Sequence, residues 1–130
     1  MPEDAHIQVA VILLKCRAPR TAIESKLRER GLEPEDAARL AEVATLIEIS
    51  RKAASMVKRG RRPGEIETAL IDAKLEPRST GDVQRALIGA GMEPESARHV
   101  ASQVIAEAQK RRAATGNDRA IDEDIGVIFS

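Results

Sequence analysis

The sequence predicts an all-α fold, a small bundle of about five or six helices with an extended C-terminal tail. Three observations predict it. Aromatic residues make up 1% of the chain and apolar residues 42%, so the core must consist of aliphatic side chains and alanine, which suit closely packed helices. In the longest uninterrupted segments, apolar residues recur with helical spacing. The heptapeptide GLEPEDA at residues 31–37 returns as GMEPESA at residues 91–97.

The repeated heptapeptide has the residues of a joint between two helices. Gly31 and Gly91 each follow an apolar run, where the end of a helix favours a residue that tolerates the left-handed conformation. Pro34 and Pro94 fit the first turn of the next helix, because no intrahelical N–H bond is lost there. Acidic residues such as Glu35 then lie near the positive end of the helix dipole. Each copy therefore predicts a short helix, a turn and a long helix.

The repetition extends beyond the joint, since Leu27 matches Leu87 in the same register. The matching segments are two full copies, at about residues 21–60 and 80–116, and two partial copies, at residues 2–5 and 66–77. Repeated helical units bury their apolar faces against neighbouring copies. We therefore predict a single helical domain over residues 1–116 and a flexible or partner-docking tail over residues 117–130.

The first element, residues 3–16, is apolar almost all round. A helix is favoured because residues 2–5 repeat the start of the long helix, while the β-branched content leaves a strand as the alternative. A helix that is apolar on all sides belongs in the middle of a core or in an interface. Because so small a chain can hardly cover such a helix, we expect self-association as a homodimer through Ile7, Val11 and Leu14.

The next two helices follow from local signals. Thr21 and Glu24 have the spacing of a capping box, which predicts a short helix that runs to about Arg30. No glycine or proline interrupts the chain between Pro34 and Arg59, so we expect one long helix of roughly 37 Å.

Three helices complete the predicted domain. Gly60 ends the first long helix, and short helices follow near residues 64–74 and 80–90. The second long helix begins at Pro94 and ends near residues 115–116. We expect the two long helices to pack antiparallel, with the short helices closing the ends.

The last residues, 117–130, differ in character from the rest of the chain. An acidic run at residues 122–124 precedes an apolar, β-prone stretch. Such a tail either stays disordered, docks on its own domain or binds a partner. Its candidate partner-binding residues are Ile125, Val127, Ile128 and Phe129.

Charge and cysteine content narrow the possible compartment and partners. The formal net charge is zero, from 21 basic and 21 acidic residues, which argues against a general affinity for nucleic acids or membrane surfaces. A single cysteine excludes an internal disulfide and is typical of a reducing compartment. No apolar stretch approaches the roughly 20 residues of a membrane span, and the start of the chain is acidic, unlike a signal peptide. We expect a cytoplasmic protein with no membrane partner.

Catalysis has little support in the sequence. No glycine-rich phosphate loop, HExxH or CxxC motif occurs. The only histidines, His6 and His99, are expected on polar helix surfaces, and Cys16 ends an apolar run where a buried, inert thiol is expected. We therefore expect no enzyme, no catalytic or metal-binding residues, no cofactor and no small-molecule ligand.

A run of cations gives the alternative functional signal. It contains no acid and could neutralise several phosphates, although cations also gather at helix C-termini because of the dipole. The second repeat resembles a helix-turn-helix, and it would present polar residues such as Arg98 and Gln103 to a groove. The candidate nucleic-acid residues are Arg51, Lys52, Lys58, Arg59, Arg61 and Arg62.

The sequence favours a non-enzymatic protein-interaction module that self-associates, such as a small adaptor, regulator or inhibitor of a larger protein. The apolar first helix, the apolar tail and the repeated helical surfaces all suit helix-in-groove contacts. A DNA-binding regulator is the alternative.

Overall fold

The structure is a computed structural model that describes the backbone of residues 2–128 and the side chains of residues 4–113. Over these residues it is all-helical, as the sequence predicts. The helices are α1 (Pro2–Lys15), α2 (Arg20–Glu29), α3 (Pro34–Lys58), α4 (Pro63–Asp72), α5 (Thr80–Gly89) and α6 (Pro94–Ile128). The first element is thus a helix, and the strand alternative is wrong.

The repeated joint ends the helices as predicted. Glycines with positive φ follow three of them: Gly31, Gly60 and Gly91. At the end of α2, the N–H of Gly31 bonds the carbonyl of Arg28 at 2.9 Å, and the N–H of Leu32 bonds the carbonyl of Leu27 at 3.2 Å. These two bonds use carbonyl groups that the end of a helix would otherwise leave without partners. The same pair of bonds recurs after α3 and after α5.

Two helices end on residues other than glycine in the same conformation. Arg17, after α1, has φ 60°, and Lys74, after α4, has φ 58°. The turn at Arg17 repeats the bond pattern of the glycine joints, since the N–H of Ala18 reaches the carbonyl of Leu13 at 3.0 Å. A side chain at positive φ is strained, so this turn holds its geometry at a conformational cost.

The core consists of alanine and aliphatic residues. α1 and α2 pack on α3 and on each other, while α4 and α5 pack on both α3 and α6. The larger hydrophobic side chains with less than 2% exposure are Ile23, Leu27, Leu40, Ile49, Ile66, Leu70, Val83, Leu87, Val100 and Val104. Between them lie buried alanines such as Ala41 and Ala101, whose small side chains let neighbouring helices approach closely.

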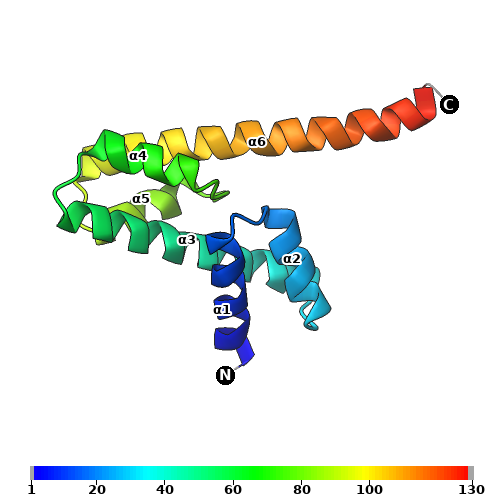
Figure 1. Ribbon diagram of the computed structural model, residues 1–130, viewed down its shortest axis with the longest axis horizontal. Helices are drawn as coiled ribbons and strands as arrows, with labels where there is room; N and C mark the ends of the chain where they lie inside the picture. Colours follow the sequence, from blue (N-terminus) through cyan, green and yellow to red (C-terminus); the bar gives the residue numbers. More distant parts are fainter. Residues whose placement is uncertain (1, 129–130) are drawn as a thin grey trace.

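The predicted packing of the two long helices is wrong. In the described part of the chain, α3 and α6 make no contact, and each of the short helices α4 and α5 contacts both of them (Figure 1). Leu70 of α4 and Leu87 of α5 are fully buried. The short helices therefore form an inner layer between the long ones, where contacts with both cover their apolar residues.

The start of α2 also differs from the prediction. α2 begins at Arg20, and Pro19 occupies the N-cap position without a side-chain cap. The carboxylate of Glu24 accepts a bond from Nε of Arg20 at 2.9 Å instead of closing a capping box with Thr21. A charged guanidinium is a stronger donor than a backbone N–H group, which explains the different partner.

The C-terminal part of α6 extends away from the other helices (Figure 1). Its backbone is helical to Ile128, beyond the end predicted near residues 115–116. Gly116 explains the difference, since a glycine inside a helix costs only about 1 kcal/mol relative to alanine and need not end it. The predicted tail residues Ile125, Val127, Ile128 and Phe129 have side chains outside the described residues.

Candidate functional site

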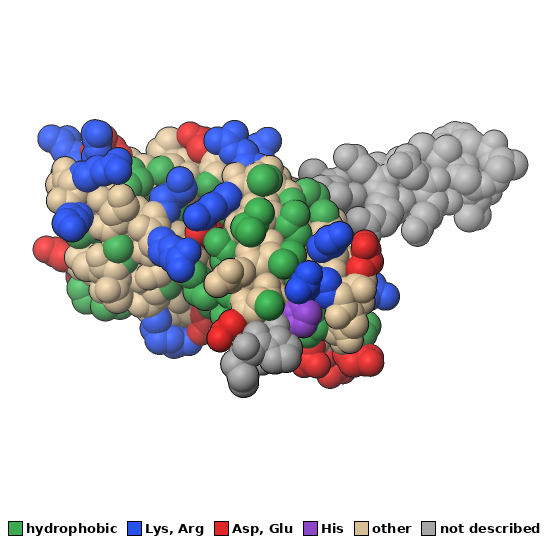
Figure 2. All heavy atoms as spheres, turned by 60° about the horizontal axis from the view of Figure 1, so that its bottom comes forward, with side chains coloured by type: hydrophobic (Ala, Val, Ile, Leu, Met, Phe, Trp, Pro, Cys, Tyr) green, Lys and Arg blue, Asp and Glu red, His purple; other side chains and the backbone are tan. Residues whose placement is uncertain are grey.

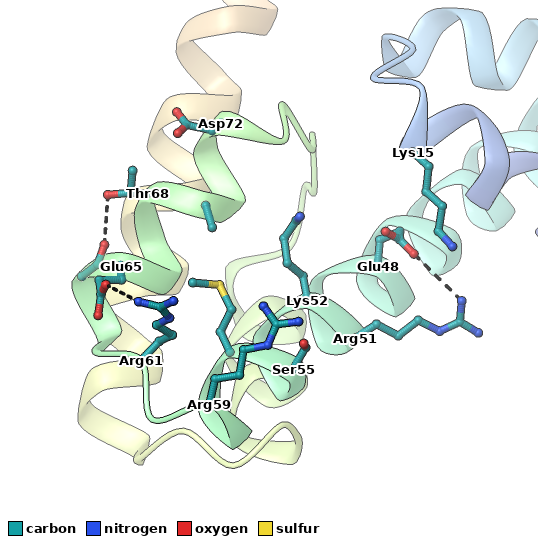
Figure 3. A pocket seen from close by; sticks show the side chains of 13 residues that line it. Lys15, Glu48, Arg51, Lys52, Ser55, Arg59, Arg61, Glu65, Thr68 and Asp72 are labelled. Carbon is teal, nitrogen blue, oxygen red and sulfur yellow. Dashed lines mark hydrogen bonds and ion pairs between the residues drawn. The ribbon is translucent and has the colours of Figure 1, made fainter.

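A charged groove lies between α3 and α4 and has a volume of about 810 Å³ (Figure 3). We call it the basic groove. Its charged lining residues are Lys15, Arg51, Lys52, Arg59 and Arg61, together with Glu48, Glu65 and Asp72. An adjoining hollow of about 350 Å³ shares Lys15 and Lys52 and adds Arg17. Among the described residues, cations from three segments of the chain therefore face one concave surface.

Helical spacing and the turn at Gly60 bring these cations together. Lys52, Ser55 and Arg59 follow one face of α3 at spacings of three and four residues. Gly60, with φ 75°, reverses the chain so that α4 returns alongside α3. This turn also places Arg61 at the mouth of the groove. In Figure 3, Lys52 and Arg59 point into the space between the two helices.

Acidic side chains balance part of this charge. Glu48 is 14% exposed, and its Oε1 lies 4.0 Å from Nη1 of Arg51. Among the described residues this buried oxygen has no hydrogen-bond partner, because 4.0 Å is too long for a hydrogen bond. Glu65 accepts a bond from the N–H of Arg62 at 3.0 Å, and Nη1 of Arg61 lies at 3.4 Å. The bond from Arg62, helped by the charge of Arg61, lowers the pKa of Glu65 below its ordinary value.

A second, apolar groove lies between α1 and α3 and has a volume of about 230 Å³. We call it the apolar groove. Its lining residues are Ile7, Gln8, Val11, Ile12, Ile47 and Arg51. Ile12 is 61% exposed, which is a high value for a large aliphatic side chain. Arg51 lines both grooves, so the two surfaces meet at this residue. Figure 2 shows apolar side chains gathered on one face with Lys and Arg beside them.

The structure brings together most of the predicted cations. Arg51, Lys52, Arg59 and Arg61 line the basic groove, whereas Lys58 and Arg62 are exposed outside its lining. Lys15 of α1 was not expected there. Its place depends on how α1 crosses α3, for which the sequence gives no signal.

The predicted self-association residues separate in the structure. Val11 and Leu14 belong mainly to the core of this chain, because α1 packs on α3, and Ile7 is only partly buried. Among the described residues of α1, the large apolar residue that is exposed is Ile12, which the prediction did not include. In a helix that is apolar all round, the sequence does not show which side remains outside.

A buried polar cluster, also missed from the sequence, surrounds Arg20, which is 6% exposed. Its Nη1 donates to the Glu42 carboxylate and to the Glu76 carbonyl, the latter at 3.0 Å. Its Nη2 donates to the Ala38 carbonyl at 2.9 Å. Glu42 also accepts the N–H of Arg78 at 3.1 Å. Nε of Arg20 also donates to Glu24, so all three nitrogens of the guanidinium form hydrogen bonds. The cluster joins α2, α3 and the loop before α5, and we therefore assign it a structural role.

The remaining reactive side chains do not form a site. Nδ1 of His6 accepts a bond from Nε of Arg30 at 3.0 Å, and Nε2 of His99 lies 3.5 Å from Glu67. Cys16 is exposed, so the predicted burial is wrong. It lies in the turn that leaves α1, whereas the core-facing residue of that helix end is Leu14. Within the described part of the chain, no group of His, Cys, Asp and Glu could hold a metal ion.

None of the helices in the described part of the chain has both the length and the apolar character that a membrane crossing requires. Comparison of the chain with protein-family models, curated proteins and solved structures gives no significant match. The chemistry of the two grooves is therefore the basis for a functional proposal.

Proposed function

We propose that this protein is a non-enzymatic protein-interaction module, an adaptor, regulator or inhibitor, that binds a partner segment carrying both apolar and acidic side chains. The observation that supports it is the meeting of the apolar and basic grooves at Arg51. A segment in the apolar groove would place flanking residues directly beside the cations of α3. A cytoplasmic location is part of the proposal, and the single cysteine is compatible with it.

The apolar groove would supply most of the binding free energy. Ile12 is 61% exposed, and covering it would contribute about 1–2 kcal/mol from its apolar area alone. Ile47 is partly buried and extends the same surface along α3. Apolar grooves between helices suit the apolar face of a short helix, which inserts residues one turn apart.

The basic groove would supply selectivity and fast association. Exposed cations at a binding site attract acidic partners over distances of about a Debye length, roughly 8–10 Å at physiological salt. Lys52 and Arg59 are exposed and lie close enough along α3 to act on one segment. Glu48 and Asp72 in the same groove would repel acids at other positions, which restricts where the acidic residues of a partner can lie.

Selection of a displayed library of random peptides against the protein tests the proposal. We expect enriched peptides to combine acidic residues with apolar residues one helical turn apart. Ile12→Asp should weaken their binding at least about tenfold, because it places a charge in the apolar groove. Arg51→Glu should weaken it and reduce its dependence on salt. The matched control is Arg28→Glu on α2, an exposed residue that lines neither groove.

Two results would contradict the proposal. One is enrichment of peptides without acidic or without apolar residues. The other is equal binding of the enriched peptides to the unmodified protein and to Ile12→Asp.

A nucleic-acid surface is the second candidate, favoured by the exposed cations Arg59, Arg61 and Arg62 around the α3–α4 turn. The acids Glu48 and Glu65 weigh against it, because they would lie near bound phosphates. Replacing the three arginines with alanine should abolish a salt-sensitive mobility shift of duplex DNA. Absence of any shift by the unmodified protein at low salt would exclude this function.

A further inference from the structure

We propose that the partner segment is the C-terminal end of a second copy of this chain, so that two copies associate by placing the end of each α6 in the grooves of the other. The inference rests on the proposed function and names the partner. Three observations carry it: the composition of residues 121–129, the direction of α6, and the order of charge along the grooves.

The C-terminal sequence has the chemistry that the grooves require. Residues 122–124 are Asp-Glu-Asp, and the segment that follows contains Ile125, Val127, Ile128 and Phe129. Ile121, Ile125 and Ile128 are spaced by four and three residues, the spacing that places side chains on one face of a helix. At about 100° per residue, positions 122 and 124 flank the line of these three isoleucines, and an apolar face flanked by acids is the pattern expected of a helix that lies in an apolar groove beside a basic one.

The direction of α6 points to a second molecule. In the described part of the chain the only helices that α6 contacts are α4 and α5, and it makes no contact with α1, which forms one wall of the apolar groove. Its C-terminal part extends away from the other helices (Figure 1). Residues 114–128 add about 22 Å to the helix at 1.5 Å per residue. A straight α6 therefore carries its end away from the grooves of its own chain, so the grooves that this end could enter are those of a second copy.

Charge complementarity specifies how the segment would lie. Among the described residues, the basic groove has five cations and three acids on its lining, and the segment carries three consecutive acids. The apolar groove continues from the basic groove at Arg51, just as the apolar residues of the segment continue from its acids. We therefore place residues 122–124 near Lys52 and Arg59, and Ile125 and Ile128 against Ile12 and Ile47. Reciprocal exchange would give a closed, two-fold symmetric dimer.

Charge reversal on the full-length chain tests the inference, with mass in solution measured by sedimentation at high micromolar concentration. One variant reverses the groove (Arg51→Glu, Lys52→Glu, Arg59→Glu), and another reverses the tail (Asp122→Lys, Glu123→Lys, Asp124→Lys). We expect the unmodified protein to dimerise and each variant alone to weaken the dimer at least about tenfold, since like charges then face each other. Mixing the two variants should restore the dimer, because each reversed groove meets a reversed tail.

The control is reversal of two exposed cations on α2, Lys26→Glu with Arg28→Glu, which line neither groove and should leave the dimer intact. Circular dichroism of every variant checks that the helices form. Since mixing restores complementarity without changing either chain, recovery of the dimer in the mixture cannot come from repaired folding.

The possible results separate this inference from the proposed function. A monomeric unmodified protein overturns the inference, while enrichment of acidic and apolar peptides would still support the grooves as a binding site. A dimer that is lost in Ile12→Asp but unchanged by tail reversal means that grooves contact each other directly, which also overturns the inference. Failure of both the dimer and the peptide selection overturns both proposals.

Discussion

The α2–α3 joint and the α5–α6 joint have nearly the same local sequence and different surroundings. The turn glycines Gly31 and Gly91 have φ values of 100° and 109°, and the same backbone bonds follow each. A Cβ atom added at Gly31 would meet nothing within 4 Å, whereas one at Gly91 would lie 3.1 Å from Cγ1 of Val57. The residue after the glycine also differs in burial. Leu32 in the first joint is partly exposed, whereas Met92 in the second is only 6% exposed. Local sequence thus determines the turn, and packing determines what a substitution there would cost.

The two copies also differ in how each is attached to the rest of the chain. The first copy contains the buried cluster of Arg20, Glu24 and Glu42. At the corresponding positions, 60 residues later, the second copy has Thr80, Gln84 and Ser102. Charged groups therefore add to the aliphatic contacts of α2, such as those of Leu27, whereas α5 and α6 associate through aliphatic side chains and alanines such as Leu87 and Ala101. The same backbone unit can evidently be stabilised by either kind of contact.

The largest expected effect comes from breaking the polar cluster of the first copy. Arg20→Ala should lower the free energy of unfolding by about 3 kcal/mol, because it leaves the Glu42 carboxylate without its buried partner. Thr80→Ala, at the matching position of the second copy, should change it by less than about 0.5 kcal/mol. Urea denaturation measures both values. Similar losses for the two variants would mean that the cluster contributes nothing particular to the first copy.

The two joint glycines should respond differently to alanine. Gly31→Ala should cost about 1 kcal/mol, the price of a left-handed alanine, and Gly91→Ala about 1 kcal/mol more because of the close contact with Val57. A double-mutant cycle with Val57→Ala should remove the extra loss at Gly91 and change nothing at Gly31. Equal losses of unfolding free energy at the two glycines would show that the Val57 side chain moves away without cost.

Arg17 extends the comparison to a joint of the same type that lacks glycine. Arg17→Gly should raise the free energy of unfolding by about 0.5 kcal/mol, since relief of the left-handed strain exceeds the added entropy of the unfolded chain. Thermal denaturation measures the change. The control is Arg17→Ala, which should not stabilise, because alanine retains the strain at φ 60°.

The smallest expected effect concerns Glu65, at the start of α4 and just before a partial copy of the repeat. Because its pKa is lowered in the folded chain, chiefly by the bond from the N–H of Arg62, its stabilising contribution is present above the unfolded pKa of about 4.3. That contribution is lost as the pH falls through the lower, folded pKa. An NMR titration should show Glu65 protonating at lower pH than an unperturbed glutamate. Glu65→Gln should remove this part of the acid sensitivity of unfolding.

The helices and their joints could be predicted from the sequence because local residues determine them. Pro34 and Pro94 begin the long helices as predicted, and Gly31, Gly60 and Gly91 end their helices. Proline and glycine act chiefly through the backbone angles of their own positions, although Gly116, which was predicted to end α6, lies inside that helix.

The arrangement of the helices and half of the candidate site could not be predicted in the same way. The separation of α3 from α6, the burial of Arg20 and the exposure of Ile12 all depend on the rotation of each helix about its axis. Alanine-rich faces fit several rotations, so composition does not select one. The sequence predicted the cations of the basic groove that lie close together along the chain, between Arg51 and Arg61. It did not predict Lys15, because this residue belongs to another helix.

The short helices between α3 and α6 also have a kinetic consequence. In the described part of the chain, every pair of contacting helices is either consecutive or separated by one intervening helix. Most helix–helix contacts therefore join segments that are near in sequence, and helical chains of this kind commonly fold within microseconds to milliseconds. During synthesis, α1 and α2 can settle on α3 before α6 has been made. The buried cluster of Arg20 is then completed only when Glu76 and Arg78, in the loop before α5, have also been made.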